Sequence, residues 1–501
     1  MMPVNDSPSV SRMQRIALTM MVALLATIPL WTNKIYYRDD LYRILDGDRS
    51  TWLSNGRPGT WLLQSLISFG DTVSDISPLN LLLGLLALSI AAVFFTERLR
   101  IPLAGFWSFL PPLFVILNPF LTQGMLYTYD SLTILLSFAG AMLASMVNRA
   151  KPFQEIVYTA LILLLIQTLY QPGLNVYIAC VALLVVSRLV NDQSSWKWLC
   201  GKIVALGIAI LTYKLAMNYL LPVKIDWYSM KHSKLLSLNS DSLQVLINTI
   251  KAFSDLFLSA YPRGMMVFIG LPMLIMFSGL IVMVRNLKQQ QKLTLSAVLM
   301  LFSAGLIVII AIPGLSLALA TPLFAPRMLG ACSITFLFCF YVAVYSLPAI
   351  RSWLAGLSAI LLFYHLVVML VTFNTVVNDQ RYQMEVMNQI KITLSAPAAQ
   401  SIDSLAFIGQ LNDAPEVQTN IRNFPIIEHI RMKMLGESEP WIWLALIKHV
   451  GLRLKAVKAT DEMRVIKPRQ VLAQGPDYDA FQDGQTMVID FRKSGGQINK
   501  L

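Results

Sequence analysis

Charged residues are scarce in this sequence of 501 residues, at 14% of the chain, whereas 56% of the residues are hydrophobic. A soluble domain carries roughly 25% charged residues. The shortage of charge therefore excludes a soluble enzyme, a disordered protein and a fibrous protein. Cysteine is also rare, and the four cysteines lie in or beside apolar segments without other metal ligands nearby. We interpret them as small core residues, so the polar C-terminal part must fold without disulfides.

Motifs for binding nucleotides are missing as well. The sequence has no Gly-rich nucleotide cradle, no Walker pattern and no Gly-x-Ser-x-Gly motif, so the use of ATP or a nucleotide sugar has no support. The net charge of +12 does not indicate a nucleic-acid partner, because the basic residues lie in short loops without interleaved aromatic residues. That pattern is typical of loops that face anionic lipid and the cytoplasm.

Long apolar segments make up most of the chain. Each has about 20 residues, which is enough to cross a hydrocarbon core of about 30 Å as a helix. We therefore predict an all-α polytopic membrane protein of about eleven transmembrane helices, followed by a small C-terminal α/β domain. The predicted spans are 15–32, 78–96, 103–117, 130–147, 156–170, 174–190, 200–221, 265–284, 293–312, 328–347 and 354–374.

Basic residues fall in alternate loops between these spans. The positive-inside rule places these loops on the inner side, so the N-terminus lies inside and an odd number of spans places the C-terminal part outside. This gives a transmembrane domain over 1–375, with long outer loops at 33–77 and 222–264, and an outer C-terminal domain over 376–501.

Short amphipathic helices are predicted on the outer side. Asp39 and Asp40 can begin one helix, and Pro58 fits the first turn of another. Such helices suit the membrane surface. In the C-terminal domain the pattern predicts helices at 379–392 and 441–450, and strands at 404–408 and 486–491.

Acidic and basic side chains collect on the outer side rather than at mid-membrane, where a proton-coupled transporter would place them. Asp39 and Asp40 closely follow the first span, at the level of a lipid phosphate. One aspartate could accept the proton of an acceptor hydroxyl, while its neighbour could orient it, raise its pKa or bind a divalent cation such as Mg or Mn. The alternative interpretation of the pair is a helix N-cap on a solvated loop.

Three arginines of the outer side are candidates for binding a donor phosphate. Arg57 lies in a Gly-Arg-Pro turn, Arg327 follows Ala325-Pro326, and Arg263 follows Tyr261-Pro262. Guanidinium groups match phosphate oxygens bidentately. Arg327 is the strongest of the three candidates, because the positive-inside rule predicts few basic residues in short outer loops. The alternative role is to anchor the adjoining helix at the membrane interface.

Aromatic and polar residues at the same face are candidates for binding the sugar or the acceptor. Asp130 opens a predicted span close to Tyr127 and Tyr129, whose rings offer stacking faces. Asp130 could bind sugar hydroxyls, or it could be an N-cap that the helix dipole favours. Gln171 lies at the outer end of a helical hairpin, where it could line the same cavity or satisfy the backbone.

In its order of motifs, the chain resembles the phage-type serotype-converting O-antigen glucosyltransferases, a Gtr-type family. The similarity rests on Tyr37-Arg38-Asp39-Asp40-Leu41-Tyr42-Arg43, Gly56-Arg57-Pro58, Ser77-Pro78-Leu79, Tyr129-Asp130-Ser131, Tyr170-Gln171-Pro172 and Ala325-Pro326-Arg327. The resemblance implies a GT-C architecture with the active site in the outer loops. It also implies that Asp39 or Asp40 acts as the base or binds a metal.

The resemblance further implies a reaction and a location. The protein would lie in the bacterial inner membrane, with its outer side in the periplasm, and would transfer glucose from undecaprenyl-phosphate to a lipid-linked O-antigen repeat. A donor synthase and a small flippase would supply the donor, and no nucleic acid is expected. Two alternatives stay open. One is a lipid A or protein glycosyltransferase that uses a polyprenyl-phosphate sugar, and the other is a polysaccharide or lipid flippase.

Overall fold

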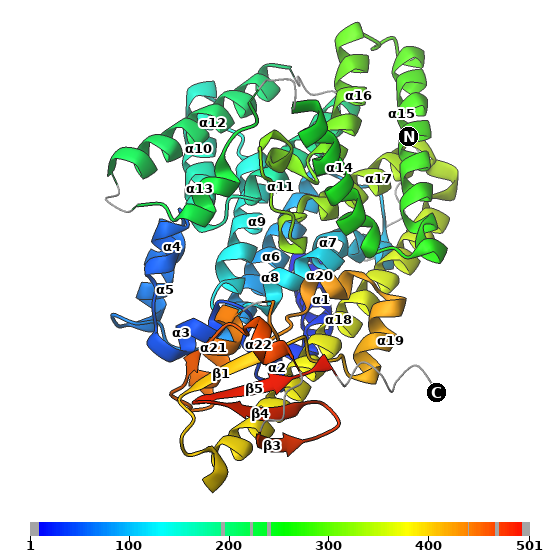
Figure 1. Ribbon diagram of the computed structural model, residues 1–501. Coiled ribbons are helices and arrows are strands. Elements are labelled where there is room, and N and C mark those ends of the chain that lie inside the picture. Colours follow the sequence, from blue (N-terminus) through cyan, green and yellow to red (C-terminus); the bar gives the residue numbers. More distant parts are fainter. Residues whose placement is uncertain are drawn as a thin grey trace.

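The protein is a bundle of helices with one small sheet at its end (Figure 1). A computed structural model describes residues 10–191, 196–220, 224–237, 242–438, 440–465 and 470–492. The end of the predicted span at residue 221, parts of the second long loop and the last nine residues lie outside the described residues.

Six helices of the described residues are long and apolar enough to cross a membrane. They are α6 (Leu79–Arg98), α10 (Pro152–Leu169), α11 (Gly173–Val190), α12 (Trp196–Leu215), α15 (Val267–Gln289) and α18 (Arg351–Leu394). A bent pair, Gly105–Ile116 and Pro119–Leu126, meets at 42° and would make a seventh crossing if it is one span. The prediction of a polytopic helical membrane protein is therefore confirmed, while the count of about eleven spans stays a prediction.

Shorter helices occupy the other predicted spans. Three of them are apolar: α9 (Ser131–Met146), α16 (Leu295–Ile310) and α17 (Ala331–Ser346). The first predicted span is divided into α1 (Arg12–Ala26) and α2 (Ile28–Thr32). The division falls at Thr27, directly before the first turn of α2, where Pro29 lies. Proline has no amide hydrogen to donate to the preceding turn and clashes with its carbonyl, so the helix cannot run straight through.

The core of the bundle lies around α17, which is buried over almost its whole length. It packs against α15, α11 and α7 (Leu110–Ile116). Helices α6 and α9 approach each other closely at Gly84, where a side-chain carbon would come within 2.9 Å of Leu135. This close contact therefore favours glycine at position 84.

Helix α18 is 44 residues long and joins the bundle to the C-terminal domain. The predicted span at 354–374 and the predicted helix at 379–392 are parts of this one helix. No glycine or proline lies between them, so nothing in the sequence ends the helix at the membrane surface. Figure 1 shows α18 running from the bundle toward the sheet.

The C-terminal domain contains a five-stranded sheet in the order β2-β1-β5-β4-β3. Strand β1 (Ser404–Ile408) pairs in parallel with β2 (Lys455–Ala456) and with β5 (Thr486–Asp490). Strands β3 (Gln470–Gln474) and β4 (Asp479–Asp483) add antiparallel pairs. The two predicted strands are thus β1 and β5, and both are largely buried. Four helices complete the domain: α19 (Pro415–Asn423), α20 (Ile426–Ile430), α21 (Pro440–His449) and α22 (Asp461–Arg464).

The first long loop forms the short helices that the sequence predicts. They are α3 (Asp40–Asp46), α4 (Ser50–Ser54) and α5 (Pro58–Ser68). Helix α3 packs against α21 of the C-terminal domain, while α5 packs against α10 of the bundle, so the loop contacts both parts. Helix α14 (Ser242–Ser259) follows in the second long loop. The remaining short segments are α8 (Thr122–Leu126), α13 (Trp227–Ser233) and the brief helical turns Gly105–Phe109, Pro119–Leu121, Ala216–Leu220, Arg263–Met265, Gly314–Ala318, Pro326–Met328, Pro348–Ile350 and Pro397–Ala399.

Candidate active site

The two adjacent aspartates at the start of α3 lie in different environments. The side chain of Asp39 is 53% exposed, whereas Asp40 is completely buried. Asp40 Oδ2 accepts hydrogen bonds from the backbone amides of Thr128, at 2.8 Å, and Tyr37, at 3.2 Å. Asp40 Oδ1 has no hydrogen-bond partner among the described residues. Burial raises the pKa of the Asp40 carboxyl to about 7, although Arg43 and the two amides oppose that rise.

These environments give the two carboxylates different tasks. Asp40 joins the first loop to the turn before α9, because both of its amide donors come from those segments. Asp39 is the member of the pair that a substrate hydroxyl can reach. Its nearest cation is Arg43, whose Nη1 lies 4.0 Å from Asp39 Oδ2.

Asp130 is buried between two arginines. Its Oδ1 lies 2.6 Å from Arg57 Nη1 and accepts a hydrogen bond of 3.0 Å from Trp52 Nε1. Its Oδ2 lies 3.1 Å from Arg43 Nη1. Three elements of the first loop are thereby tied to the start of α9, since Arg43 is in α3, Trp52 in α4 and Arg57 precedes α5. The carboxylate is occupied by protein groups.

Arg57 and Gln171, both predicted ligand-binding residues, hold the turn between α4 and α5. Arg57 donates to the carbonyl of Leu169 at 2.8 Å, and its guanidinium lies 5.4 Å from the Tyr170 ring. Gln171 Nε2 donates to the carbonyl of Gly56 at 3.1 Å. Gly56 has a φ of +72°, which an L-residue rarely adopts, so this turn favours glycine.

Arg327 is half-buried among tyrosines. Its guanidinium is 5.3 Å from the centre of the Tyr127 ring, and its backbone amide donates to Gln123 Oε1 at 3.3 Å. Asp39 and Tyr170 lie close enough to interact with it electrostatically. Among the described residues, no carboxylate reaches ion-pair distance of the Arg327 guanidinium.

The two predicted tyrosines, Tyr127 and Tyr129, are both buried in this region. Tyr127 is buried edge-on against Tyr37, with ring centres 4.8 Å apart. Tyr129 is buried beside Trp52, and its hydroxyl has no hydrogen-bond partner among the described residues.

Arg263 is the third predicted phosphate ligand. Within the described part of the chain, no contact joins it to Asp39, Arg57 or Arg327. It lies exposed in the turn before α15. Its role in binding a phosphate therefore stays a prediction.

Sequence reasoning missed several residues of the cluster. Arg43 supplies the second cation to Asp130, and Arg38 lies beside the Tyr37 hydroxyl with Nε at 3.3 Å. Tyr37 donates to the carbonyl of Ile430, so the C-terminal domain also reaches the site. Arg38 and Arg43 lie on either side of the aspartate pair in the sequence. This closeness of opposite charges could have indicated that the two arginines belong to the same cluster.

The sequence left open whether the aspartate pair binds a divalent cation, and the described residues do not form a site that fits one. No group of three His, Cys, Asp or Glu side chains among them could hold a metal ion. Asp40 is buried under two amide donors, and only Asp39 of the pair is open. We therefore derive no chemical step through a metal.

A comparison with known proteins identifies the family. The sequence model described as Glucosyl transferase GtrII matches residues 28–338. The chain belongs to the GtrII glucosyl transferase family. This confirms the Gtr-type resemblance, and all the predicted site residues lie within the matched region.

A relative from Salmonella phage P22 supports the same family. It is described as an uncharacterized 55.3 kDa protein in the gtrB 5' region, and it is 29% identical over 242 residues. The aligned part covers 47% of this chain and 48% of the phage protein, so the chain matches about half the length of that relative.

Proposed function

We propose that this GtrII family protein transfers glucose from undecaprenyl-phosphate to a lipid-linked O-antigen repeat on the periplasmic face of the bacterial inner membrane. The observation that carries the proposal is an exposed carboxylate, Asp39, near the Arg327 guanidinium, which pairs with no carboxylate of the described residues, at the rim of an apolar helical bundle. A base for a hydroxyl and a cation for a phosphate are the two groups that this transfer needs.

Asp39 is the catalytic base in this mechanism. The acceptor hydroxyl oxygen attacks the anomeric carbon of glucose while its proton passes to the Asp39 carboxylate. The bond between the anomeric carbon and the phosphate oxygen breaks, and its electron pair leaves with undecaprenyl phosphate. The single displacement inverts the anomeric configuration. General-base catalysis of this kind contributes about 10²–10⁴ in rate.

Arg327 stabilises the phosphate as it gains negative charge. A guanidinium matches phosphate oxygens in a fork, and a partly buried one acts with less competition from water. The Tyr127 ring holds the guanidinium from one side, with the centre of the ring at 5.3 Å.

Asp40 is a positioning residue for Asp39. Its bonds to the amides of Tyr37 and Thr128 fix the start of α3 and therefore the direction of the Asp39 side chain. Asp130 fixes the other end of the same loop through Arg43 and Arg57.

The isoprenoid chain of the donor lies in an apolar groove of about 830 Å³ between α11, α12 and α16. The outer end of this groove is formed by Gly314 and Leu315, and the amide of Leu315 donates to Asn175 Oδ1 at 3.2 Å. Asn175 is in the first turn of α11, just after Tyr170, which faces Arg57 and Arg327. The outer end of the groove is thus joined by one hydrogen bond to the helix that begins next to Tyr170.

Transfer by purified protein from chemically defined donors tests the proposal. We expect transfer from polyprenyl-phosphate glucose, no transfer from nucleotide-linked glucose, and the same rate with and without a chelator. Transfer from a nucleotide sugar, or no transfer from any lipid-phosphate sugar to the O-antigen acceptor, would overturn it.

A further inference from the structure

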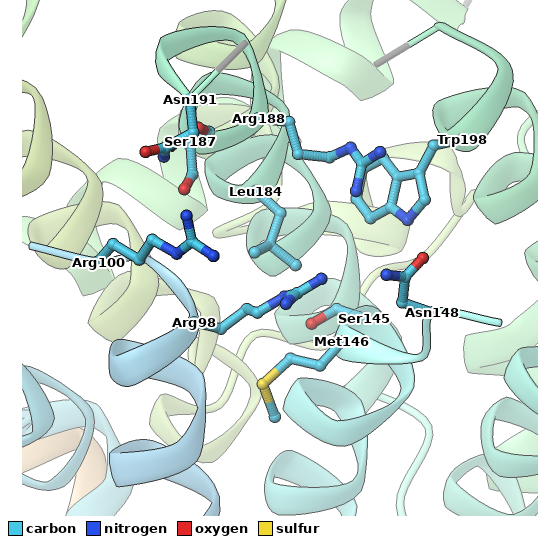
Figure 2. A pocket seen from close by; sticks show the side chains of 10 residues that line it. All are labelled: Arg98, Arg100, Ser145, Met146, Asn148, Leu184, Ser187, Arg188, Asn191 and Trp198. Carbon is cyan, nitrogen blue, oxygen red and sulfur yellow. Dashed lines mark hydrogen bonds between the residues drawn. The ribbon is translucent and has the colours of Figure 1, made fainter. Parts of the chain in front are cut away.

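A basic pocket lies at the far ends of the helices that begin at the candidate active site. Asn80, near the start of α6, donates to the carbonyl of Thr128 at 3.0 Å, and α9 begins directly after Asp130. Helix α11 begins three residues after Tyr170. The opposite ends of α6, α9 and α11 together form the pocket shown in Figure 2.

The lengths of these helices place the pocket at the other surface of the membrane. Helices α6, α9 and α11 have 20, 16 and 18 residues. With a rise of 1.5 Å per residue, they span about 24–30 Å, which matches a hydrocarbon core of about 30 Å. The pocket therefore lies at the level of the lipid headgroups in the opposite leaflet.

The described lining of the pocket carries three arginines and no carboxylate. Its polar members are Arg98, Arg100, Arg188, Asn148, Asn191, Ser145 and Ser187. The described acids nearby have other partners: Glu97 lies 2.7 Å from Arg12, and Glu155 lies 3.1 Å from Lys202. Arg98 and Arg100 thus give this side of the pocket a positive charge that an anion would neutralise.

Arg188 is half-buried against an aromatic ring, whereas Arg98 and Arg100 are exposed at the end of α6. The Arg188 guanidinium lies 4.9 Å from the centre of the Trp198 ring, and Figure 2 shows the two side chains next to each other. Arg100 has a φ of +53°, and its carbonyl accepts a hydrogen bond of 2.6 Å from the Tyr345 hydroxyl. In Figure 2, Arg98 and Arg100 approach the pocket from the end of α6, facing the side chains of α11.

We propose that this pocket binds the phosphate headgroup of an anionic phospholipid in the leaflet opposite the candidate active site. Guanidinium groups recognise phosphate oxygens bidentately, and basic pockets between transmembrane helices bind anionic headgroups. The cavity is small, about 20 Å³, which is room for one or two water-sized groups. It admits phosphate oxygens but not a sugar ring, while the acyl chains stay in the surrounding bilayer.

Thermal unfolding of the full-length protein in neutral detergent tests this proposal. Binding to the folded state alone raises its stability. We expect phosphatidylglycerol to raise the Tm of the wild type more than phosphatidylcholine does, and the double variant Arg98→Gln/Arg100→Gln to lose that difference. The matched control is Arg149→Gln, because Arg149 lies exposed beside Tyr158, at 5.0 Å, and does not line the pocket.

Three results would overturn the proposal. In the first, phosphatidylglycerol raises the Tm of the double variant as much as that of the wild type. In the second, Arg149→Gln loses the response as the double variant does, and in the third, inorganic phosphate alone raises the Tm of the wild type as much as phosphatidylglycerol does. If the double variant does not fold, the wild type is instead crosslinked with a photoreactive phosphatidylglycerol and the labelled peptides are identified. Adducts on the peptides that contain residues 98–100 and 188 support the proposal, and labelling confined to other helices overturns it.

Discussion

At the scale of residues, the aspartate pair shows what a sequence can and cannot specify. The sequence predicts that Asp39 and Asp40 matter together, but it does not divide their roles. At the start of a helix, successive side chains point about 100° apart, so one of two neighbours can be buried while the other is exposed. Which one is buried depends on Tyr37 and Thr128, and Thr128 is distant in sequence.

Replacing Arg327 tests the phosphate-binding role. We expect Arg327→Gln to lower kcat for glucosyl transfer by about 10²–10³, the usual cost of removing one group that stabilises a developing anion. Arg327→Lys retains the charge without the fork and should recover part of the rate. Arg285→Gln, at an exposed arginine of α15, is the control. An Arg327→Gln protein with wild-type kcat would exclude the assignment.

The raised pKa of Asp40 predicts a pH dependence of stability. The native state retains a proton on Asp40 up to about pH 7, whereas the unfolded chain releases it near pH 4. The free energy of unfolding should therefore fall as pH rises through this window and level off above it. Thermal unfolding between pH 5 and 8 measures this slope.

The Asp40→Asn variant should lose this part of the slope. Asp39→Asn still contains the Asp40 carboxyl and should keep it. Parallel profiles of wild type and Asp40→Asn would show that the slope does not come from Asp40.

At the scale of elements, the sequence predicts most of the helices and the two central strands of the sheet. It does not show that α18 is one continuous helix. The hydropathy pattern ends the predicted span where the apolar residues end, but the backbone stays helical beyond that point. It also does not show that Asp130 lies between Arg43 and Arg57. That arrangement depends on packing of the first loop against α9, which local periodicity does not encode.

Removing the Asp130 carboxylate should loosen this packing. Asp130→Asn leaves the buried Arg43 and the partly buried Arg57 without their shared carboxylate, which costs about 3–5 kcal/mol of unfolding free energy. Glu97→Gln breaks an ion pair in which Arg12 is 53% exposed, and should cost about 0–1 kcal/mol. Equilibrium unfolding in detergent compares the two variants. Equal, small effects would show that the buried pairs do not hold the loop.

At the scale of the whole molecule, the bundle, the first loop and the C-terminal domain meet around one site. The family match covers residues 28–338 and therefore leaves out the C-terminal domain. The sequence predicts that domain and its two main strands. It gives no sign that α21 packs on α3 or that Ile430 bonds to Tyr37, since these contacts join residues almost 400 positions apart.

The groove between α11, α12 and α16 predicts that transfer depends on the length of the donor chain. Ala182→Phe fills the buried floor of the groove. It should raise KM at least about tenfold for the undecaprenyl donor, while a ten-carbon donor reacts at the wild-type rate. Leu274→Phe, at a position that is 65% exposed on α15, is the matched control. Equal losses with both donors would place the chain elsewhere.

The most direct test of Asp39 as the catalytic base is the rate of glucosyl transfer from undecaprenyl-phosphate glucose by the Asp39→Asn protein. Because this variant removes the exposed carboxylate and keeps the buried one, we predict a kcat lower by about 10²–10⁴. The Tm and the donor KM should stay near their wild-type values. A kcat equal to that of the wild type would contradict the mechanism, since no other group has been assigned the proton of the acceptor hydroxyl.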